Sequence, residues 1–179
     1  MEYLAQLDVR LTNALRLRSE SRFWQRLFSF FAHSGDSWFW LAGLGLVWLW
    51  GDTAWHNQSA FIGVVLVLES AFVLALKFAI RRRRPEGEWG AIYRSTDPHS
   101  FPSGHASRAA LLAVVGLGLG PAWFGWLLLF WAPLVSLARV SMGVHYLSDV
   151  LAGIVLGSLI GLAALQIQPW IFSLPLLFR

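Results

Sequence analysis

The sequence has no cysteine and few charged residues for its length. The absence of cysteine excludes disulfide bonds, thiolate nucleophiles and cysteine-ligated zinc sites. Of the 179 residues, 13% are charged, whereas soluble globular domains carry about 25%. Residues 1–22 are polar and basic and lack an apolar core, so we expect no cleaved signal peptide. The shortage of charge disfavours a soluble globular fold.

Hydrophobic residues are what the sequence has in abundance. They make up 56% of the chain, and the mean hydropathy is +0.56. They come in blocks, which predicts an all-α fold, a polytopic transmembrane helical bundle. The net charge is +4, and the arginines border apolar blocks, as expected for residues that anchor a protein at a membrane surface. We therefore expect membrane lipids, and no nucleic acid, as partners.

Five apolar segments are candidate membrane spans. They are Ser37–Trp50, Ser59–Ile80, Gly104–Leu119, Ala122–Ala138 and His145–Leu165. The first is short for a hydrocarbon core of about 30 Å, but it carries tryptophans at both ends, as interfacial belts do. Glycines are frequent in the third and fifth segments, which favours close helix packing in lipid. We expect five spans in one transmembrane domain, residues 37–179.

The N-terminal segment, residues 1–36, has a different pattern. From Met1 to Arg26 leucines recur at a helical spacing with arginines between them, which predicts an amphipathic helix in the membrane interface. Phe23–Phe31 is apolar but too short to count as a span, although a crossing there would raise the number to six. The tail after Leu165 is apolar and interrupted by proline, and we expect it to be interfacial.

Ionisable residues in or beside the apolar segments are costly, so each is a functional candidate. They are Glu69, Lys77, Arg84, His105, Arg108, Arg139, His145 and Asp149. Lys77 and Arg84 are seven residues apart, which returns to nearly the same helical face and lets two cations converge on one anion. Pro85 places Arg84 at the helix end. For Arg81, Arg82 and Arg83 we expect side chains that reach out to the membrane surface.

Two further patterns concern histidine. His145 and Asp149 are four residues apart, so on a helix the carboxylate can bind one ring nitrogen and leave the other as a nucleophile or base. A purely structural pair is the alternative. Ser103 and Gly104 begin a helix just before His105, where backbone N–H groups favour an anion. The alternative is that Ser103 serves as a plain helix cap.

Together these residues predict phosphoryl transfer without a metal ion. Lys77, Arg84 and Arg139 supply positive charge for the phosphoryl oxygens, and the helix N-terminus supplies N–H donors. One histidine can attack phosphorus while the other protonates the leaving oxygen.

The same residues resemble the three signature motifs of the type 2 phosphatidic acid phosphatase superfamily. The motifs are Lys77-x6-Arg84-Pro85, Pro102-Ser103-Gly104-His105 and Arg139-x5-His145-x3-Asp149. The resemblance implies that His145 is the nucleophile and forms a phosphohistidine, that Asp149 orients it, and that His105 is the general acid. The phosphate-binding residues that it implies are Lys77, Arg84, Ser103, Gly104 and Arg139. No metal and no cofactor is expected.

A few positions lie outside this pattern. The third motif of the family normally has serine before its arginine, where this chain has Ala138, and we expect the missing hydroxyl to be of secondary importance. We expect Glu69 to hold a cation in place and Arg108 to be an ordinary residue of a first helical turn. His99 matches no motif.

The resemblance implies an integral-membrane lipid phosphatase that hydrolyses a phosphate monoester or diphosphate of a lipid, including a prenyl diphosphate. A phosphotransferase on the same fold, which passes phosphoryl or a head group to an alcohol, is the alternative from another enzyme class. A non-catalytic binding protein is a third reading, which the complete set of charged motif residues disfavours. The residues do not distinguish one lipid head group or chain from another.

With five spans, the N-terminus and the catalytic loop lie on the same side of the membrane. Arginines gather in both segments: Arg10, Arg16, Arg18, Arg22, Arg26, Arg81, Arg82, Arg83, Arg84 and Arg94. The opposite side has Arg179. The positive-inside rule then predicts a multi-pass protein of the cell (inner) membrane whose catalytic face is cytoplasmic.

Overall fold

The computed structural model describes residues 2–17, 21–86 and 97–173. These residues form seven α-helices, and Arg83 and His99 form an isolated antiparallel bridge. The helices are α1 (Glu2–Leu15), α2 (Arg22–Ser34), α3 (Ser37–Trp50), α4 (Thr53–Ile80), α6 (Gly104–Leu119), α7 (Ala122–Ser141) and α8 (Leu147–Phe172). The predicted all-α class is confirmed.

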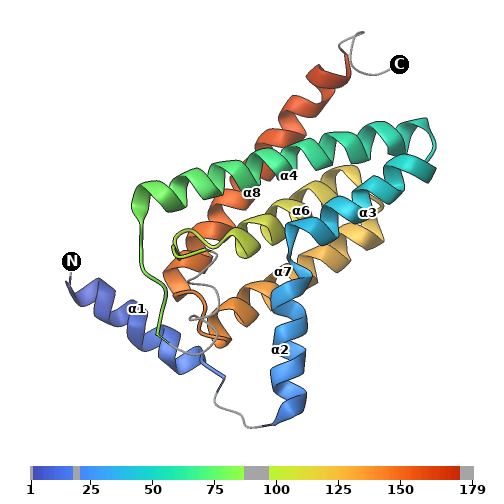
Figure 1. The fold of residues 1–179 in the computed structure, drawn as a ribbon. Helices are drawn as coiled ribbons and strands as arrows, with labels where there is room; N and C mark the ends of the chain where they lie inside the picture. The colour runs from blue at the N-terminus through green and yellow to red at the C-terminus, as the bar shows by residue number, and fades with distance from the viewer. Residues whose placement is uncertain (1, 18–20, 87–96, 174–179) are drawn as a thin grey trace.

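The apolar helices pack as a membrane bundle (Figure 1). By length and composition, α4, α7 and α8 can each cross a membrane, while α3 and α6 are shorter apolar helices. Large apolar side chains such as Leu68, Phe130 and Leu159 are exposed on the outside of the bundle, where lipid would cover them. These five helices correspond to the five expected spans.

Several helix ends differ from the prediction. Helix α4 begins at Thr53 rather than Ser59 because Asp52 caps it, its Oδ1 accepting a hydrogen bond from the Trp55 N–H at 3.0 Å. Helix α8 runs to Phe172 with Pro169 inside it. The tail after Leu165, which we expected to be interfacial, therefore continues the helix as far as Phe172. Residues 174–179 lie outside the described part of the chain.

The single N-terminal helix expected from Met1 to Arg26 is wrong. Helix α1 ends at Leu15 and α2 begins at Arg22. The Leu17 N–H donates to the carbonyl oxygen of Ser141 at 2.9 Å, so this donor bonds to the end of α7 rather than to its own preceding turn. This contact with α7 therefore ends α1. Figure 1 shows that α2 and α3 meet at a sharp corner.

Helix α6 lies between α4 and α7 in Figure 1, and its backbone packs closely against α8. Its apolar side chains, such as Leu111 and Val115, pack in one core with Leu128 and Val135 of α7 and Ala164 of α8. Because α6 is buried nearly all round, its position fixes the positions of the helices around it.

Glycines allow α6 and α8 to approach very closely. They recur every four residues along α8, at Gly153, Gly157 and Gly161. A Cβ at Gly153 would lie 2.5 Å from the carbonyl oxygen of Ser103, and one at Gly157 would overlap that of Ser107. The expected close packing in these two segments is confirmed, and it sets the N-termini of α6 and α8 side by side.

A substitution of Gly157 tests this packing. We expect Gly157→Ala to destabilise the bundle by about 1–3 kcal/mol, because the methyl group forces α8 away from the α6 backbone. The measurement is the midpoint of thermal unfolding in detergent.

Gly63→Ala in α4 is the matched control, since a Cβ there meets nothing within 4 Å. It should be neutral or stabilising by up to about 1 kcal/mol, because alanine is the better helix former. Equal midpoints for the two variants would contradict the packing argument.

Candidate active site

The residues singled out from the sequence gather at one end of the bundle. The C-terminal ends of α4 and α7 meet the N-terminal ends of α6 and α8 there (Figure 1). The site residues buried at this end are Lys77, Arg84, Ser103, Gly104, Arg139, His145 and Asp149. His105 is partly buried. Their joint burial away from bulk water strengthens every charge interaction among them.

Lys77 and Arg84 converge, as predicted, but not through a shared helical face. Helix α4 ends at Ile80, and Arg81 has a left-handed backbone conformation with φ of 55°. Arg84 therefore belongs to the loop that follows, and the expectation that it sits at the end of the helix that carries Lys77 is wrong. The Ser100 N–H donates to the Arg82 carbonyl at 2.8 Å, which fastens this loop to the segment before α6.

Asp97 is the carboxylate that the two cations share, and the sequence analysis missed it. Its Oδ2 accepts a hydrogen bond from Arg84 Nη2 at 2.7 Å and also contacts Lys77 Nζ. The Arg84 Nε–H donates to the Asp97 carbonyl at 2.7 Å. The available signal was an acidic residue shortly before the second motif, but loop residues have no periodicity from which to infer their direction.

His145 lies in the turn before α8 rather than on it. Gly143, with φ of 66°, forms the turn, and α8 begins at Leu147. The predicted pairing on one helical face is therefore wrong, although His145 and Asp149 do face each other. Nδ1 of His145 is 3.6 Å from Asp149 Oδ2, a separation for an electrostatic pair and longer than a hydrogen bond.

The other ring nitrogen of His145 faces Arg84. Nε2 lies 3.2 Å from Arg84 Nη1, and because a guanidinium can act only as a donor, Nε2 accepts with its lone pair. Burial lowers the pKa of His145 well below its ordinary value, and the charges of Arg139, Arg84 and Lys77 lower it further. The imidazole is thus neutral near pH 7, with a nucleophilic nitrogen beside a cation.

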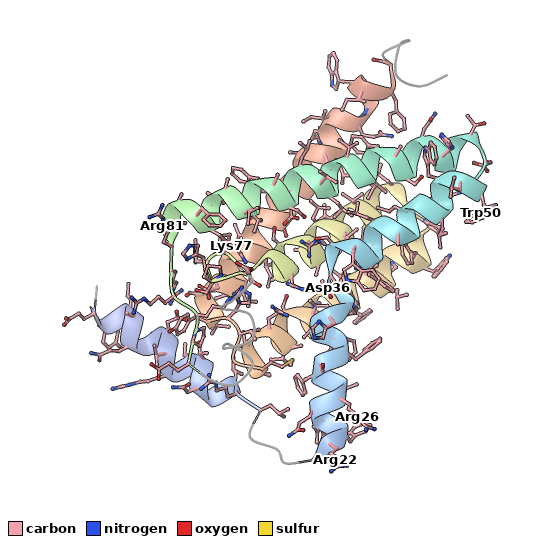
Figure 2. All side chains as sticks on the ribbon, viewed as in Figure 1. Arg22, Arg26, Asp36, Trp50, Lys77 and Arg81 are labelled. Atoms are coloured by element: carbon pink, nitrogen blue, oxygen red, sulfur yellow. The ribbon has the colours of Figure 1, made fainter. Side chains whose placement is uncertain are left out.

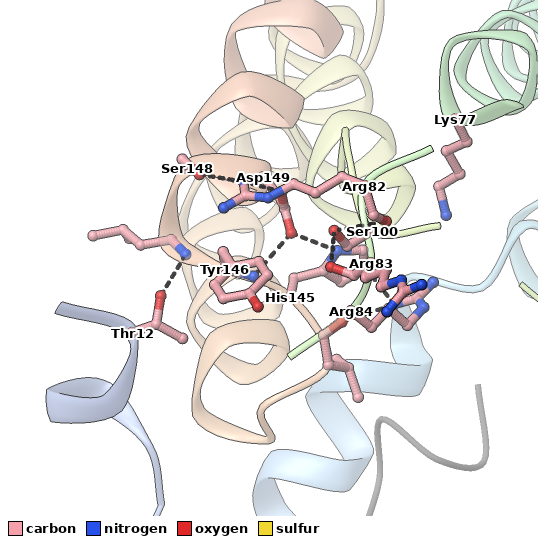
Figure 3. A network of polar contacts seen from close by, with 12 residues as sticks. Thr12, Lys77, Arg82, Arg83, Arg84, Ser100, His145, Tyr146, Ser148 and Asp149 are labelled. Carbon is pink, nitrogen blue, oxygen red and sulfur yellow. Dashed lines mark hydrogen bonds and ion pairs between the residues drawn. The ribbon is translucent and has the colours of Figure 1, made fainter. Parts of the chain in front are cut away.

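Asp149 is held by a network that the sequence did not predict (Figure 3). Its Oδ1 accepts from Arg82 Nη1 at 2.6 Å, and its Oδ2 accepts from the Tyr146 N–H at 2.9 Å. Arg82 also donates to Ser148 and Asp8 at 2.6 Å and lies over the Tyr146 ring, 4.2 Å from its centre. The expectation that Arg82 reaches out to the membrane surface is wrong.

Helix α1 completes this network. Asp8 Oδ1 accepts from the Ser148 N–H and Thr12 Oγ1 accepts from the Leu147 N–H, each at 3.0 Å. The first backbone donors of α8 are thus capped by side chains of another helix. No local pattern reveals a cap whose two partners are 140 residues apart in the chain.

At the start of α6, Ser103 does not cap its own helix. Its N–H donates to the Asp149 carbonyl at 2.9 Å. Its Oγ is buried without a hydrogen-bond partner among the described residues. A buried hydroxyl in this state is a suitable donor for an incoming ligand. The alternative that Ser103 serves as a plain helix cap is therefore wrong.

His105 and Arg108 extend from the next turn of α6 toward α2 and α3. His105 Nε2 pairs with Asp36 Oδ1 at 2.6 Å. Arg108 is buried, donates to the Gly35 carbonyl at 2.6 Å and lies 4.0 Å from Glu69 Oε2. Arg108 is therefore not an ordinary first-turn residue, and it is the cation that Glu69 faces.

Arg139 contacts α2, whereas His99 packs against α4. Arg139, near the end of α7, is buried, and its Nη1 donates to the Ala32 carbonyl of α2 at 3.5 Å. His99 packs edge-on against Phe78, with ring centres 5.4 Å apart, so it stabilises the loop. Ala138, the departure from the family motif, is fully buried.

The arrangement can bind and polarise a compact anion. Three buried cations lie around the neutral imidazole of His145, and His105 lies in the same group. In the described part of the chain, no group of three or more histidine, aspartate or glutamate side chains is placed to hold a metal ion.

Comparisons with known proteins find sequence similarity to phosphatases. An undecaprenyl-diphosphatase of Sulfolobus acidocaldarius is 36% identical over 115 residues, covering 60% of this chain and 55% of the relative. A decaprenylphosphoryl-5-phosphoribose phosphatase of Mycobacterium tuberculosis is 37% identical over 95 residues, covering 51% of this chain and 50% of the relative. The chain spans about half the length of these curated relatives.

Two crystal structures share the fold. A phosphatidylglycerolphosphate phosphatase from Bacillus subtilis superposes with a TM-score of 0.79 at 23% identity, over 96% of this chain and 89% of that one. Aquifex aeolicus LpxE gives 0.70 at 22% identity, over 89% and 95%. The model of the PAP2 superfamily matches residues 58–173, a range that contains every motif residue from Lys77 to Asp149. The match covers more than half of the sequence, and the chain belongs to the PAP2 superfamily.

Proposed function

We propose that this chain is an integral-membrane lipid phosphatase that acts through a phosphohistidine and needs no metal. The observation that carries the proposal is the neutral Nε2 of His145, 3.2 Å from the Arg84 guanidinium, in a buried group of cations. A nucleophile next to fixed positive charge is what attack on an anionic phosphorus centre requires.

The charge balance of the site supports phosphate binding. Lys77 and Arg84 share the carboxylate of Asp97, so one anion already occupies the position between them. A phosphate group can take that position with more oxygen acceptors, and Arg139 and the Ser103 hydroxyl would bind its remaining oxygens. Arginine and lysine would then neutralise charge that grows on the oxygens during transfer.

The first step transfers the phosphoryl group to the enzyme. Nε2 of His145 forms a bond to phosphorus while the bond from phosphorus to the lipid oxygen breaks. His105 gives its proton to that oxygen, which leaves as an alcohol, or as a lipid phosphate when the substrate is a diphosphate. Asp149 stabilises the positive charge that develops on the His145 ring.

The second step returns the enzyme to its starting state. His105 takes a proton from water, the water oxygen bonds to phosphorus, and the bond between phosphorus and Nε2 breaks. Orthophosphate leaves, His145 is neutral again and His105 is protonated. If an alcohol replaces water in this step, the product is a new phosphate ester, which is the phosphotransferase alternative.

The substrate we propose is a lipid phosphate or prenyl diphosphate. The named relatives support this class, because one is an undecaprenyl-diphosphatase and another a phosphatase of a decaprenylphosphoryl sugar. The site also lies at the end of a bundle of apolar helices, where a lipid head group would meet it.

We further propose that the protein is in the cell membrane with its site on the cytoplasmic face. Helix α1 and the loop after α4 lie at the same end of the bundle (Figure 1), which supports the expected topology. Arg82 and Arg84 are engaged in the site, and Arg18 and Arg94 lie outside the described residues. The charge bias then rests on Arg10, Arg16, Arg22, Arg26, Arg81 and Arg83.

The central experiment measures orthophosphate release in detergent with EDTA present. The panel contains undecaprenyl diphosphate, phosphatidic acid, phosphatidylglycerophosphate and a soluble phosphate ester, each with and without an added alcohol acceptor. We expect release from at least one lipid, and His145→Ala should lower the rate by about a thousandfold or more.

His56→Ala is the matched control, because His56 hydrogen-bonds the Trp48 carbonyl at 2.8 Å, where α3 joins α4, away from the site. It should keep the wild-type rate. Release that survived His145→Ala, or that required an added divalent metal, would contradict the proposed mechanism. Transfer to the acceptor in place of release would favour the phosphotransferase.

A second prediction concerns Asp97. Its carboxylate competes with phosphate for Lys77 and Arg84, so Asp97→Asn should strengthen inhibition by orthophosphate on the order of tenfold, the equivalent of one charge-assisted hydrogen bond. The measurement is the inhibition constant, with Asp52→Asn as the control at another helix corner. Weaker inhibition in Asp97→Asn would mean that Asp97 instead arranges the cations.

Sidedness can be tested because the chain has no cysteine. A cysteine in place of exposed Arg83 should react with an impermeant thiol reagent only after the cells are permeabilised. A cysteine in place of exposed Trp50, at the other end of the bundle in Figure 2, should react in intact cells. The reverse pattern would place the site outside the cytoplasm.

A further inference from the structure

Asp36 occupies a position where an aspartate normally caps a helix, yet it does something else. It is the residue before α3, at the corner that α2 and α3 form (Figure 2), and its side chain does not cap α3. Instead Oδ1 pairs with His105 Nε2 at 2.6 Å. Asp52 shows the ordinary arrangement one corner later, where the carboxylate caps α4.

The corner that carries Asp36 is firmly anchored. Ser34 accepts a hydrogen bond from Trp40 at its carbonyl and another from Trp131 at its hydroxyl, each at 2.9 Å. Arg108, one turn after His105 on α6, donates to the Gly35 carbonyl at 2.6 Å. A Cβ at Gly35 would lie 3.3 Å from the His105 ring. The corner therefore packs directly on the imidazole, and its position is fixed by α3, α6 and α7.

The charges around His105 make its pairing with Asp36 important. Burial disfavours a positive charge on the His105 ring most, Arg139 of α7 and Arg108 of its own helix disfavour it further, and Asp36 opposes them. The facing carboxylate is Asp36, whose Oδ2 is 3.5 Å from His33 of α2. A general acid must be protonated before the reaction, so it needs an anion that offsets the two arginines.

The carboxyl group of Asp36 is suited to that task. Burial alone would raise its pKa, but the hydrogen bond from His105 and the charges of His105, His33 and Arg139 outweigh burial and lower the pKa. Asp36 therefore stays ionised near neutral pH and can stabilise a proton on its partner.

We propose that Asp36 is a positioning residue that favours the protonated form of His105 and aims it at the leaving oxygen. The inference rests on the proposed phosphatase function and adds a residue outside the three motifs. Because Nε2 is engaged by Asp36, Nδ1 is the nitrogen that passes its proton to the leaving group in the first step and takes one from water in the second. Asp36 itself remains a carboxylate throughout.

The test compares two substrates that differ in how much they need a general acid. One is an alkyl phosphate and the other an aryl phosphate with the same hydrocarbon chain, whose leaving phenolate is stable without a proton. We expect Asp36→Asn to lower kcat for the alkyl ester on the order of tenfold to a hundredfold. The rate with the aryl ester should change much less.

A pH profile supplies the second readout. Wild-type activity should fall on the alkaline side as His105 loses its proton. Without the negative charge of Asp36 the imidazolium is less stable, so in Asp36→Asn this limb should move to lower pH. Asp36→Glu restores a carboxylate and should return the limb toward its wild-type position, even where its longer side chain lowers kcat.

Asp52→Asn is the control, because it alters the equivalent corner aspartate without touching the site. Equal losses with the two esters and an unmoved alkaline limb in Asp36→Asn would overturn the inference. If Asp36→Asn does not fold, judged by its thermal midpoint, Asp36→Glu decides alone: a loss confined to the alkyl ester supports the inference and equal losses overturn it. A wild-type protein inactive on both esters and on the lipid panel would instead refute the phosphatase proposal.

Discussion

The contact between the backbones of α6 and α8 is the constraint on which the rest of the structure depends. Gly153 and Gly157 let the two helices meet with no side chain between them, and the Ser103 N–H then reaches the Asp149 carbonyl at 2.9 Å. The second and third motifs are thereby joined through the main chain. Since α6 is also surrounded by α4 and α7, one close approach sets the geometry of all three motifs.

Each cation of the site, including the partly buried Arg82, has an acidic neighbour or a backbone acceptor. Asp97 serves Lys77 and Arg84, Asp149 serves Arg82, and the carbonyl of Ala32 serves Arg139. Charges this far from water are costly without such partners. Phosphate can enter by exchange with one carboxylate, so the site need not pass through a state with unpaired cations.

The sequence predicted what depends on local periodicity and composition. The helical class, the five apolar segments and the convergence of Lys77 with Arg84 were all inferred correctly, and α3 and α6 have their predicted bounds. It failed where a residue far along the chain decides the outcome. Bonds across the fold end α1 after Leu15 and turn Arg82 inward, and Asp36 and Asp97 act from corners and loops that have no repeating pattern.

The caps that α1 places on α8 bear on how the protein is made. Asp8 and Thr12 are synthesised well before the N–H groups that they accept from, because Leu147 and Ser148 follow them by 135 and 140 residues. During that interval α1 can lie in the membrane interface, because its pattern is amphipathic. The network around Asp149 therefore cannot assemble until the start of α8 has been synthesised, and its assembly joins α1 to α8.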